Sequence, residues 1–145
     1  MKKLILPILL LALAVPQFAS AQCKSFTKKN CREPLEDYTG NGQYNGAVMF
    51  EGEEATLSQT FYSGQDYRLF VCSQPSISDS LYFEVMDYRK NVLYSSRNSG
   101  EKVFDFTLES TQQLKMRVVV PSLGTANNLK KNGCVSIMVG FKKQE

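Results

Sequence analysis

The sequence predicts an all-β fold, namely a two-sheet antiparallel β-sandwich of jelly-roll or Greek-key type with about eight strands. From Gly46 onward, apolar and polar residues alternate with a period of two in short runs, which is the pattern of half-buried strands. Turn residues separate these runs at nearly even intervals, and this spacing is typical of β-sandwiches and barrels. No stretch after residue 46 has the periodicity of an amphipathic helix.

The expected strands share this alternation and end at polar or glycine-containing turns; they are residues 47–50, 55–62, 67–72, 81–86, 92–95, 103–108, 114–120 and 135–141. In the third run, Tyr67, Leu69 and Val71 point to one face, and Arg68 and Phe70 point to the other. Because the alternation is one-sided, each sheet is expected to bury one face and to expose the other to solvent. The sandwich domain is expected to span residues 46–145.

Residues 1–21 have the features of a cleavable secretory signal peptide. Two lysines at positions 2 and 3 precede an apolar run over residues 4–15, and the small residues Ala19 and Ala21 mark a cleavage site. The mature chain is therefore expected to begin at Gln22. It should be exported to the periplasm, the cell surface or the medium.

Membrane attachment is the alternative to cleavage and release. An uncleaved anchor is disfavoured, because the apolar run is shorter than the roughly 20 residues that span a bilayer. A lipoprotein attached at Cys23 is disfavoured because Gln22, rather than a small residue, precedes that cysteine. No later segment is apolar enough to span a membrane, so the mature chain is not expected to do so.

The charge balance bears on the class of partner. Cleavage removes two of the 17 Lys and Arg residues and none of the 14 Asp and Glu residues, so the mature chain is nearly neutral. Nucleic-acid binding demands a basic stripe, so this balance argues against DNA or RNA as a partner. The mature chain has a usual size for one domain with one core.

The sequence contains no histidine. This absence removes Ser-His-Asp and Cys-His catalysis and every zinc site that uses histidine. It also removes the usual general base near neutral pH. An enzyme would have to work with carboxylates, tyrosine, lysine or a bound metal, so the sequence predicts a protein that is not an enzyme.

Four cysteines remain after cleavage, and an even number in an exported chain predicts two disulfides among Cys23, Cys31, Cys72 and Cys134. Three connectivities can join them. We favour Cys23–Cys31 with Cys72–Cys134, because the first bond would tie down residues 22–45, which show little periodicity and are expected to form a coil or a short helix. A four-cysteine metal site or a redox pair is disfavoured, because no C-x-x-C motif is present.

Residues 57–141 resemble the bacterial pre-peptidase C-terminal domain family. The resemblance rests on a strand-turn-strand segment at residues 61–69 (FYSGQDYRL), on residues 83–87 (FEVMD) and on residues 91–94 (NVLY). It implies a jelly-roll-like sandwich with a binding or secretion-linked role and, in some members, calcium. The chain departs from the pattern in its four cysteines and because no peptidase segment accompanies it. It also looks like small secreted proteins of Bacteroidetes-type bacteria.

Acidic residues form one candidate site. Glu51, Glu53 and Glu54 fall within four residues, and Asp79 and Asp87 flank one expected strand. Carboxylate oxygens are the ligands that calcium prefers, so these residues could hold calcium if the fold brings them together. The alternative is turn chemistry, since Asp favours turns through local hydrogen bonds and no D-x-D-x-D-G loop is present.

Tyrosines form the other candidate site. Tyr62, Tyr82 and Tyr94 fall at positions expected on a solvated sheet face or near its rim. Exposed aromatic side chains there could stack on a glycan or anchor a protein partner. The alternative is cross-strand packing within the core.

Three functions follow, in order of preference. The first is a non-catalytic exported binding or structural module for a protein or glycan partner. The second is a calcium-stabilised adhesion or accessory domain. The third is a carboxylate-only hydrolase such as a glycosidase, which needs two carboxyl groups facing each other roughly 5 to 9 Å apart across a cleft.

Overall fold

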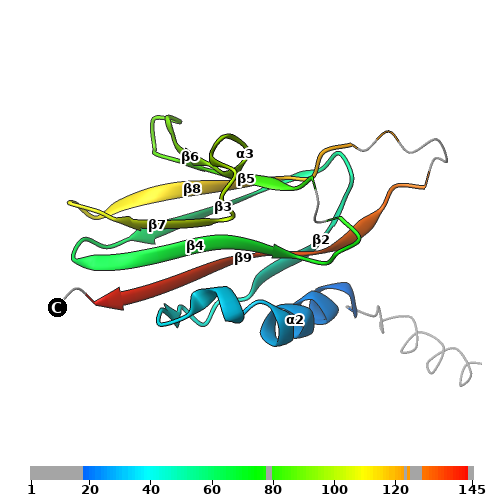
Figure 1. The fold of residues 1–145 in the computed structure, drawn as a ribbon, viewed down its shortest axis with the longest axis horizontal. Helices are drawn as coiled ribbons and strands as arrows, with labels where there is room; N and C mark the ends of the chain where they lie inside the picture. Colours follow the sequence, from blue (N-terminus) through cyan, green and yellow to red (C-terminus); the bar gives the residue numbers. More distant parts are fainter. Residues whose placement is uncertain (1–17, 78–79, 123, 125–128, 144–145) are drawn as a thin grey trace, which may run out of the picture.

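The computed structural model describes residues 18–77, 80–122, 124 and 129–143 as two β-sheets packed face to face (Figure 1). The described residues form nine strands, all paired antiparallel. One sheet, sheet A, contains β1 (Thr39–Gly40), β9 (Asn132–Lys143), β4 (Gln65–Ser73) and β7 (Val103–Thr107) in that order, with β2 (Asn45–Phe50) also paired to β9. The other, sheet B, contains β3 (Glu54–Phe61), β8 (Gln112–Val119), β5 (Tyr82–Met86) and β6 (Val92–Ser95).

The sequence-based fold class is confirmed, and each of the eight expected strands is present within a few residues of its expected ends. The short strand β1 was not expected, and a one-turn helix α3 (Ser96–Ser99) replaces part of an expected loop. Within the described residues, β5 and β6 form a hairpin in one sheet, whereas every other connection from β2 to β9 crosses between the sheets.

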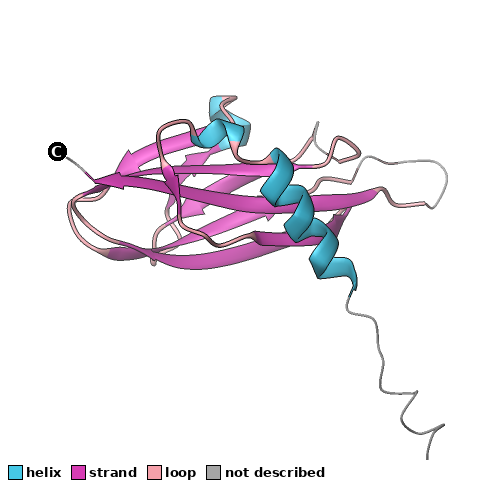
Figure 2. Ribbon diagram, turned by 90° about the horizontal axis from the view of Figure 1, so that it is seen from below, coloured by secondary structure: helices cyan, strands magenta, loops and turns pink. Residues whose placement is uncertain are grey.

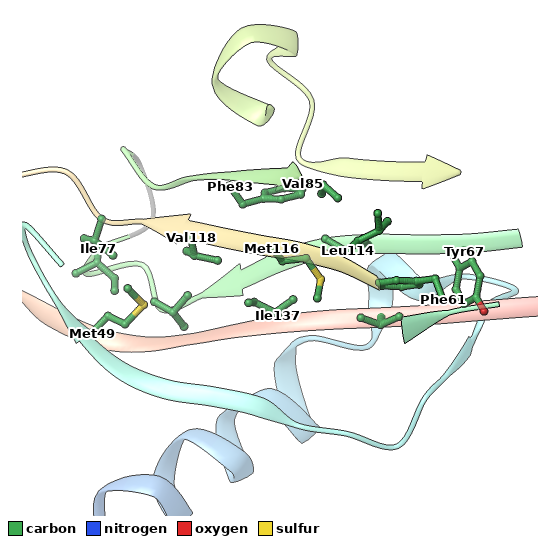
Figure 3. Close-up of a cluster of buried hydrophobic side chains, with 14 residues drawn as sticks. Met49, Phe61, Tyr67, Ile77, Phe83, Val85, Leu114, Met116, Val118 and Ile137 are labelled. Atoms are coloured by element: carbon green, nitrogen blue, oxygen red, sulfur yellow. The ribbon is translucent and has the colours of Figure 1, made fainter. Parts of the chain in front are cut away.

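The core lies between the two sheets and is built from the inward positions of the alternating runs (Figure 3). Phe61, Phe83 and Met116 are among its fully buried side chains. The ring of Phe61 meets Tyr67 edge to face, with centroids 4.9 Å apart. This arrangement is one that aromatic pairs prefer, so the end of the core between β3 and β4 is held by ring contacts.

The outer face of sheet A is covered by the N-terminal part of the chain (Figure 2). Helix α2 (Phe18–Asn30) and the 3-10 turn η1 (Glu33–Leu35) lie against it. We call residues 18–38 the N-terminal cover. Under it, Phe70 and Met138 are buried together with Leu35. The expectation of one solvated face per sheet is therefore wrong for sheet A, because the cover buries outward side chains of β4 and β9.

Two disulfides fasten the cover, and our favoured pairing is wrong. The bonds are Cys23–Cys134 and Cys31–Cys72. Eight residues along a helix correspond to about 12 Å, which is too far for a bond between Cys23 and Cys31. Both cysteines instead reach the sheet, one at β9 and the other at β4. Because the Cys23 sulfur is bonded to Cys134, the structure also contradicts lipid attachment at Cys23.

Helix α2 resolves the expected coil or short helix in favour of a helix, and it begins upstream of the expected cleavage site after Ala21. Residues 1–17 lie outside the described residues, so the signal peptide remains a prediction. No helix within the described ranges is long and apolar enough to cross a membrane.

Close approach of the cover depends on glycine in β9. A Cβ atom at Gly140 would lie 2.7 Å from Leu35 Cδ2 and 2.8 Å from Tyr38 Cβ, so any larger residue would push the cover away. Beneath α2, the hydroxyl groups of Thr27 and Ser136 form a buried hydrogen bond. These contacts show that β9 is shaped for burial on both faces.

Arg68 joins the cover to sheet A. Its guanidinium donates to both carboxylate oxygens of Asp105, at 2.8 and 2.7 Å, and to Glu36 at 2.7 Å. It also donates to the Pro34 carbonyl at 3.1 Å and lies 4.6 Å from the Tyr38 ring centroid. The Asp105 and Glu36 carboxylates raise the pKa of Arg68, so the guanidinium keeps its charge at every ordinary pH.

Candidate functional site

The acidic residues nominated as calcium ligands are mostly engaged elsewhere. Glu53 accepts a hydrogen bond from the Phe50 backbone N–H at 2.9 Å, and Glu54 pairs with Arg117 at 3.2 Å. Glu51 is buried, and one of its carboxylate oxygens has no hydrogen-bond partner among the described residues. In the part of the chain that the structure describes, no three or more His, Cys, Asp or Glu side chains gather closely enough to hold a metal ion.

Calcium binding stays a prediction of the sequence, because Asp79 lies outside the described residues. A thermal melt of the mature chain with calcium and with chelator tests it. A calcium site that forms only in the folded state raises the melting temperature. An unchanged melting temperature would contradict a folding-linked site.

A carboxylate pair suited to hydrolysis would need a cleft between its members. Glu54 and Glu84 approach each other across Arg117, which bonds to both at 3.2 and 3.0 Å. Arg68 separates its own two carboxylates in the same way. Since arginine occupies the space between the carboxylates, a glycosidic bond cannot be placed between them.

The structure does not bring the three tyrosines together. Tyr82 lies at the start of β5 opposite Val119, whereas Tyr62 follows Phe61, which lies opposite Gln112 at the other end of β8. Seven residues along a strand separate these ends by about 23 Å. A single ligand surface that includes Tyr62 and Tyr82 would have to run the whole length of sheet B.

Each tyrosine also has its own environment. Tyr62 is exposed, and the Arg97 guanidinium lies 5.1 Å from the ring centroid of Tyr82. Tyr94 stacks on Phe104 with centroids 4.3 Å apart, and its hydroxyl donates to the Glu101 carbonyl at 2.5 Å. Tyr94 therefore packs at the edge of the core. For this tyrosine the structure supports the alternative of packing rather than an exposed binding surface.

The hairpin between β5 and β6 is an exposed feature whose tip is held by several hydrogen bonds. At its tip, one carboxylate oxygen of Asp87 accepts hydrogen bonds from the backbone N–H groups of Arg89 and Asn91, both at 2.8 Å. The other oxygen accepts one from the Asn91 side-chain amide, also at 2.8 Å. These bonds, first that from the Asn91 side chain, lower the pKa of Asp87. The turn is therefore held by its own side chains.

The hairpin tip also contains a strained residue. Lys90 has a φ of 67°, in the left-handed region that residues other than glycine rarely adopt. Such strain costs on the order of 1 kcal/mol and persists only where surrounding contacts enforce it. Here Lys90 donates its backbone N–H to the Asp87 carbonyl at 3.0 Å, which closes the turn. Strained backbone concentrates at functional sites, so the tip is a candidate contact surface.

Exposed apolar and aromatic side chains gather on this hairpin. Tyr88 is 72% exposed, and Val92 and Leu93 on β6 are 54% and 47% exposed. The Arg89 guanidinium lies 5.2 Å from the Tyr88 ring centroid, and its Nε donates to the Tyr88 hydroxyl at 2.7 Å. We call Tyr88, Arg89, Val92 and Leu93 the hairpin patch. Tyrosine and arginine dominate the energetics of protein interfaces.

Sequence reasoning identified residues 87–91 as a turn but missed the hairpin patch. The usable signal was the adjacent pair Val92 and Leu93, because strict alternation would bury one of them. On the edge strand β6 both are exposed instead. An edge strand lacks a neighbour on one side, so its side chains are less covered than those of a central strand.

Comparison with known proteins bears on the fold. No family model and no curated protein matches the chain. Among solved structures, the chain is similar to PliG of Aeromonas hydrophila, a periplasmic lysozyme inhibitor of g-type lysozyme, with a TM-score of 0.50 and 10% sequence identity. The likeness covers 74% of this chain and 90% of that chain. At such a low sequence identity, the likeness shows that the two proteins share a fold and shows nothing more.

Proposed function

We propose that this protein is an exported, non-catalytic binding protein that docks onto another protein through the hairpin patch. The observation that carries the proposal is Tyr88, which stands exposed on a turn that Asp87 locks. Two disulfides fit an exported protein, because such bonds are rare in reducing compartments. The absence of histidine from the sequence supports a role without catalysis.

A locked turn favours tight binding on physical grounds. Association costs free energy for every loop and side chain that becomes ordered in the complex. The hydrogen bonds to Asp87 order the tip in advance, so little of that cost remains. Tyr88 and Arg89 add a large amphipathic ring and a charged donor, which suit the centre of an interface.

The similarity to PliG supports the class of function. PliG is an inhibitor of g-type lysozyme, and it shares its fold with this chain. A fold hosts many functions, so the partner has to be found through the surface rather than the fold. We use g-type lysozyme as the first protein probe because it is the enzyme that PliG inhibits, and variants of the hairpin patch test whether this surface is the one that binds.

Binding of the mature chain to g-type lysozyme is measured by surface plasmon resonance, with Tyr88→Ala and Arg89→Ala as test variants. Replacement of an interface anchor is expected to weaken binding by about thirtyfold, the effect of about 2 kcal/mol. Arg97→Ala is the matched control, since Arg97 also lies over a tyrosine but outside the hairpin.

If lysozyme does not bind, a photo-crosslinking residue at position 88 identifies the partner in extracts of the host envelope. The same residue at position 62, also exposed, is the control. A protein adduct formed at 88 and not at 62 supports the proposal. Equal adducts at both positions, or binding to glycans alone, would contradict it.

A further inference from the structure

The two edges of the sandwich, where the last strands of the two sheets face each other, are filled by different side chains. Where β6 and β7 meet, Tyr94, Phe104 and Phe106 form a stack with centroids 4.3 and 4.9 Å apart. Where β2 and β3 meet, the residues include Ala47 and Ala55, whose side chains are too small to fill the space. A hollow of about 230 Å³ remains there. We call it the apolar hollow.

The apolar hollow reaches the core. Its floor includes Met49, Val118 and Ile137, which belong to the buried cluster between the sheets (Figure 3). Leu57 adds a further apolar wall, and more of the surface that lines the hollow is apolar than polar. Such a surface favours an apolar ligand, because each buried methylene contributes through the hydrophobic effect.

Tyr44 separates the apolar hollow from a second hollow of about 320 Å³ and lines both. The second hollow contains polar groups, among them Asn41 and the exposed Arg32. Arg32 donates a hydrogen bond from Nη2 to the Tyr44 hydroxyl at 3.1 Å. An apolar space and a cationic donor therefore meet at one side chain.

The charge beside Tyr44 is positive. Lys24, Lys28 and Arg32 are exposed and follow one another at intervals of four residues. The Arg32 hydrogen bond lowers the pKa of Tyr44, and the positive charges of Arg32, Lys28 and Lys24 lower it further. Glu36 also lines the second hollow, but it is held 2.7 Å from Arg68. An anionic group is thus favoured at this end.

Two side-chain amide groups in the walls of the hollows lack a hydrogen-bond acceptor within the described chain. Asn45 lines the apolar hollow and Asn41 lines the second one. The side-chain nitrogen of each is buried without a hydrogen-bond partner among the described residues. A buried donor without a partner is unfavourable, so an acceptor oxygen at either wall would be stabilised there.

We propose that these two hollows bind a free fatty acid of medium chain length. Its acyl chain lies in the apolar hollow against Met49 and Leu57, and its carboxylate lies at Arg32 and the Tyr44 hydroxyl. The volume of the apolar hollow suits a short acyl chain rather than a drug-sized ligand, for which sites begin near 300 Å³. This site is separate from the hairpin patch, which lies on the opposite edge of sheet B.

The test is a titration of the mature chain by calorimetry with decanoate, decanol and decyltrimethylammonium. Decanoate is expected to bind at least tenfold more tightly than either of the others, because only it has both the chain and the negative charge. Equal affinity for the cationic and anionic probes would overturn the proposal. Binding to anionic phospholipid vesicles without binding to decanoate would also overturn it.

Two variants place the ligand. Ala47→Phe fills the apolar hollow from an exposed position on β2, and Arg32→Gln removes the cation. Each is expected to weaken decanoate binding at least tenfold, and Arg97→Gln is the matched control for lost charge. If Ala47→Phe does not fold, Ala55→Phe fills the same space from β3. Unchanged affinity in a folded hollow-filling variant would overturn the proposal.

Discussion

The outer faces of the two sheets differ in what covers them. On sheet A, Phe70 and Met138 point outward and are buried by the N-terminal cover. On sheet B, no segment of the described chain buries the outer face in this way, and several outward positions are polar and exposed, among them Thr56, Ser58 and Lys115. On sheet A, the apolar outward residues Phe70 and Met138 are the sequence sign of the covering segment. The covering segment of sheet A is the N-terminal cover, which precedes the first strand in the chain.

The same ionic arrangement occurs on both faces in different surroundings. Each face has an arginine between two carboxylates, Arg68 on sheet A and Arg117 on sheet B. The Arg68 side chain is 14% exposed, because the cover lies over it, whereas Arg117 is 33% exposed. Solvent weakens ion pairs, so the covered arginine should matter more to stability.

Removal of a disulfide should have the largest effect on the covered face of sheet A. Cys31–Cys72 and Cys23–Cys134 close loops of 41 and 111 residues, and in the chain-entropy model each bond stabilises the fold by about 4 to 5 kcal/mol. We expect Cys31→Ser with Cys72→Ser to lower the free energy of unfolding by about 4 kcal/mol in urea titrations. Amides of α2 should then exchange faster than those of sheet B. Equal protection of α2 before and after the change would contradict this role.

Gly140→Ala should have the next largest effect. The new Cβ would meet Leu35 and Tyr38 at less than 3 Å, so the cover must shift. Overpacking of this kind lowers stability by about 1 to 3 kcal/mol. Ser58→Ala, on the open face, is the control and should change stability by less than about 0.5 kcal/mol. Similar denaturation midpoints for the two variants would mean that the cover does not depend on close approach.

Arg68→Met and Arg117→Met compare the two ion-pair arrangements directly. Loss of the charged hydrogen bonds of Arg68 should lower stability by about 2 kcal/mol. Loss of the more exposed Arg117 should lower it by less than about 1 kcal/mol. Thermal melts of both variants at low and high salt measure the difference. A larger effect for Arg117 would reverse our view of the two faces.

Acid should produce the smallest effect, at the link between the cover and β9. Lys142 donates to Asp37 at 3.1 Å, and this hydrogen bond lowers the pKa of Asp37 below its ordinary value of 3.8. A carboxyl group with a lowered folded-state pKa stabilises the protein above pH 3.8, and the stabilisation is lost as pH falls through the lower folded pKa. Asp37→Asn should therefore flatten the fall of the melting temperature below about pH 4. An identical acid profile in the variant would exclude this link.

Much of the fold and little of the site could be predicted from the sequence. The alternation at Tyr67, Leu69 and Val71 placed β4 correctly, because side-chain direction in a strand depends only on the nearest residues. The apolar Phe70 on the opposite face was the visible sign of the cover. The hairpin patch escaped prediction, because exposure of Val92 and Leu93 depends on which strand lies at the sheet edge.

The sequence by itself determined eight of the strands, the all-β class and the number of disulfides, since these follow from local alternation and cysteine count. Only the tertiary structure decided which cysteines pair, because Cys23 lies in α2, Cys31 directly follows that helix, and each reaches a strand that is distant in the chain. It also decided which face is covered and which sides of the sandwich stay open. Those features depend on contacts between segments far apart in sequence, and periodicity carries no information about them.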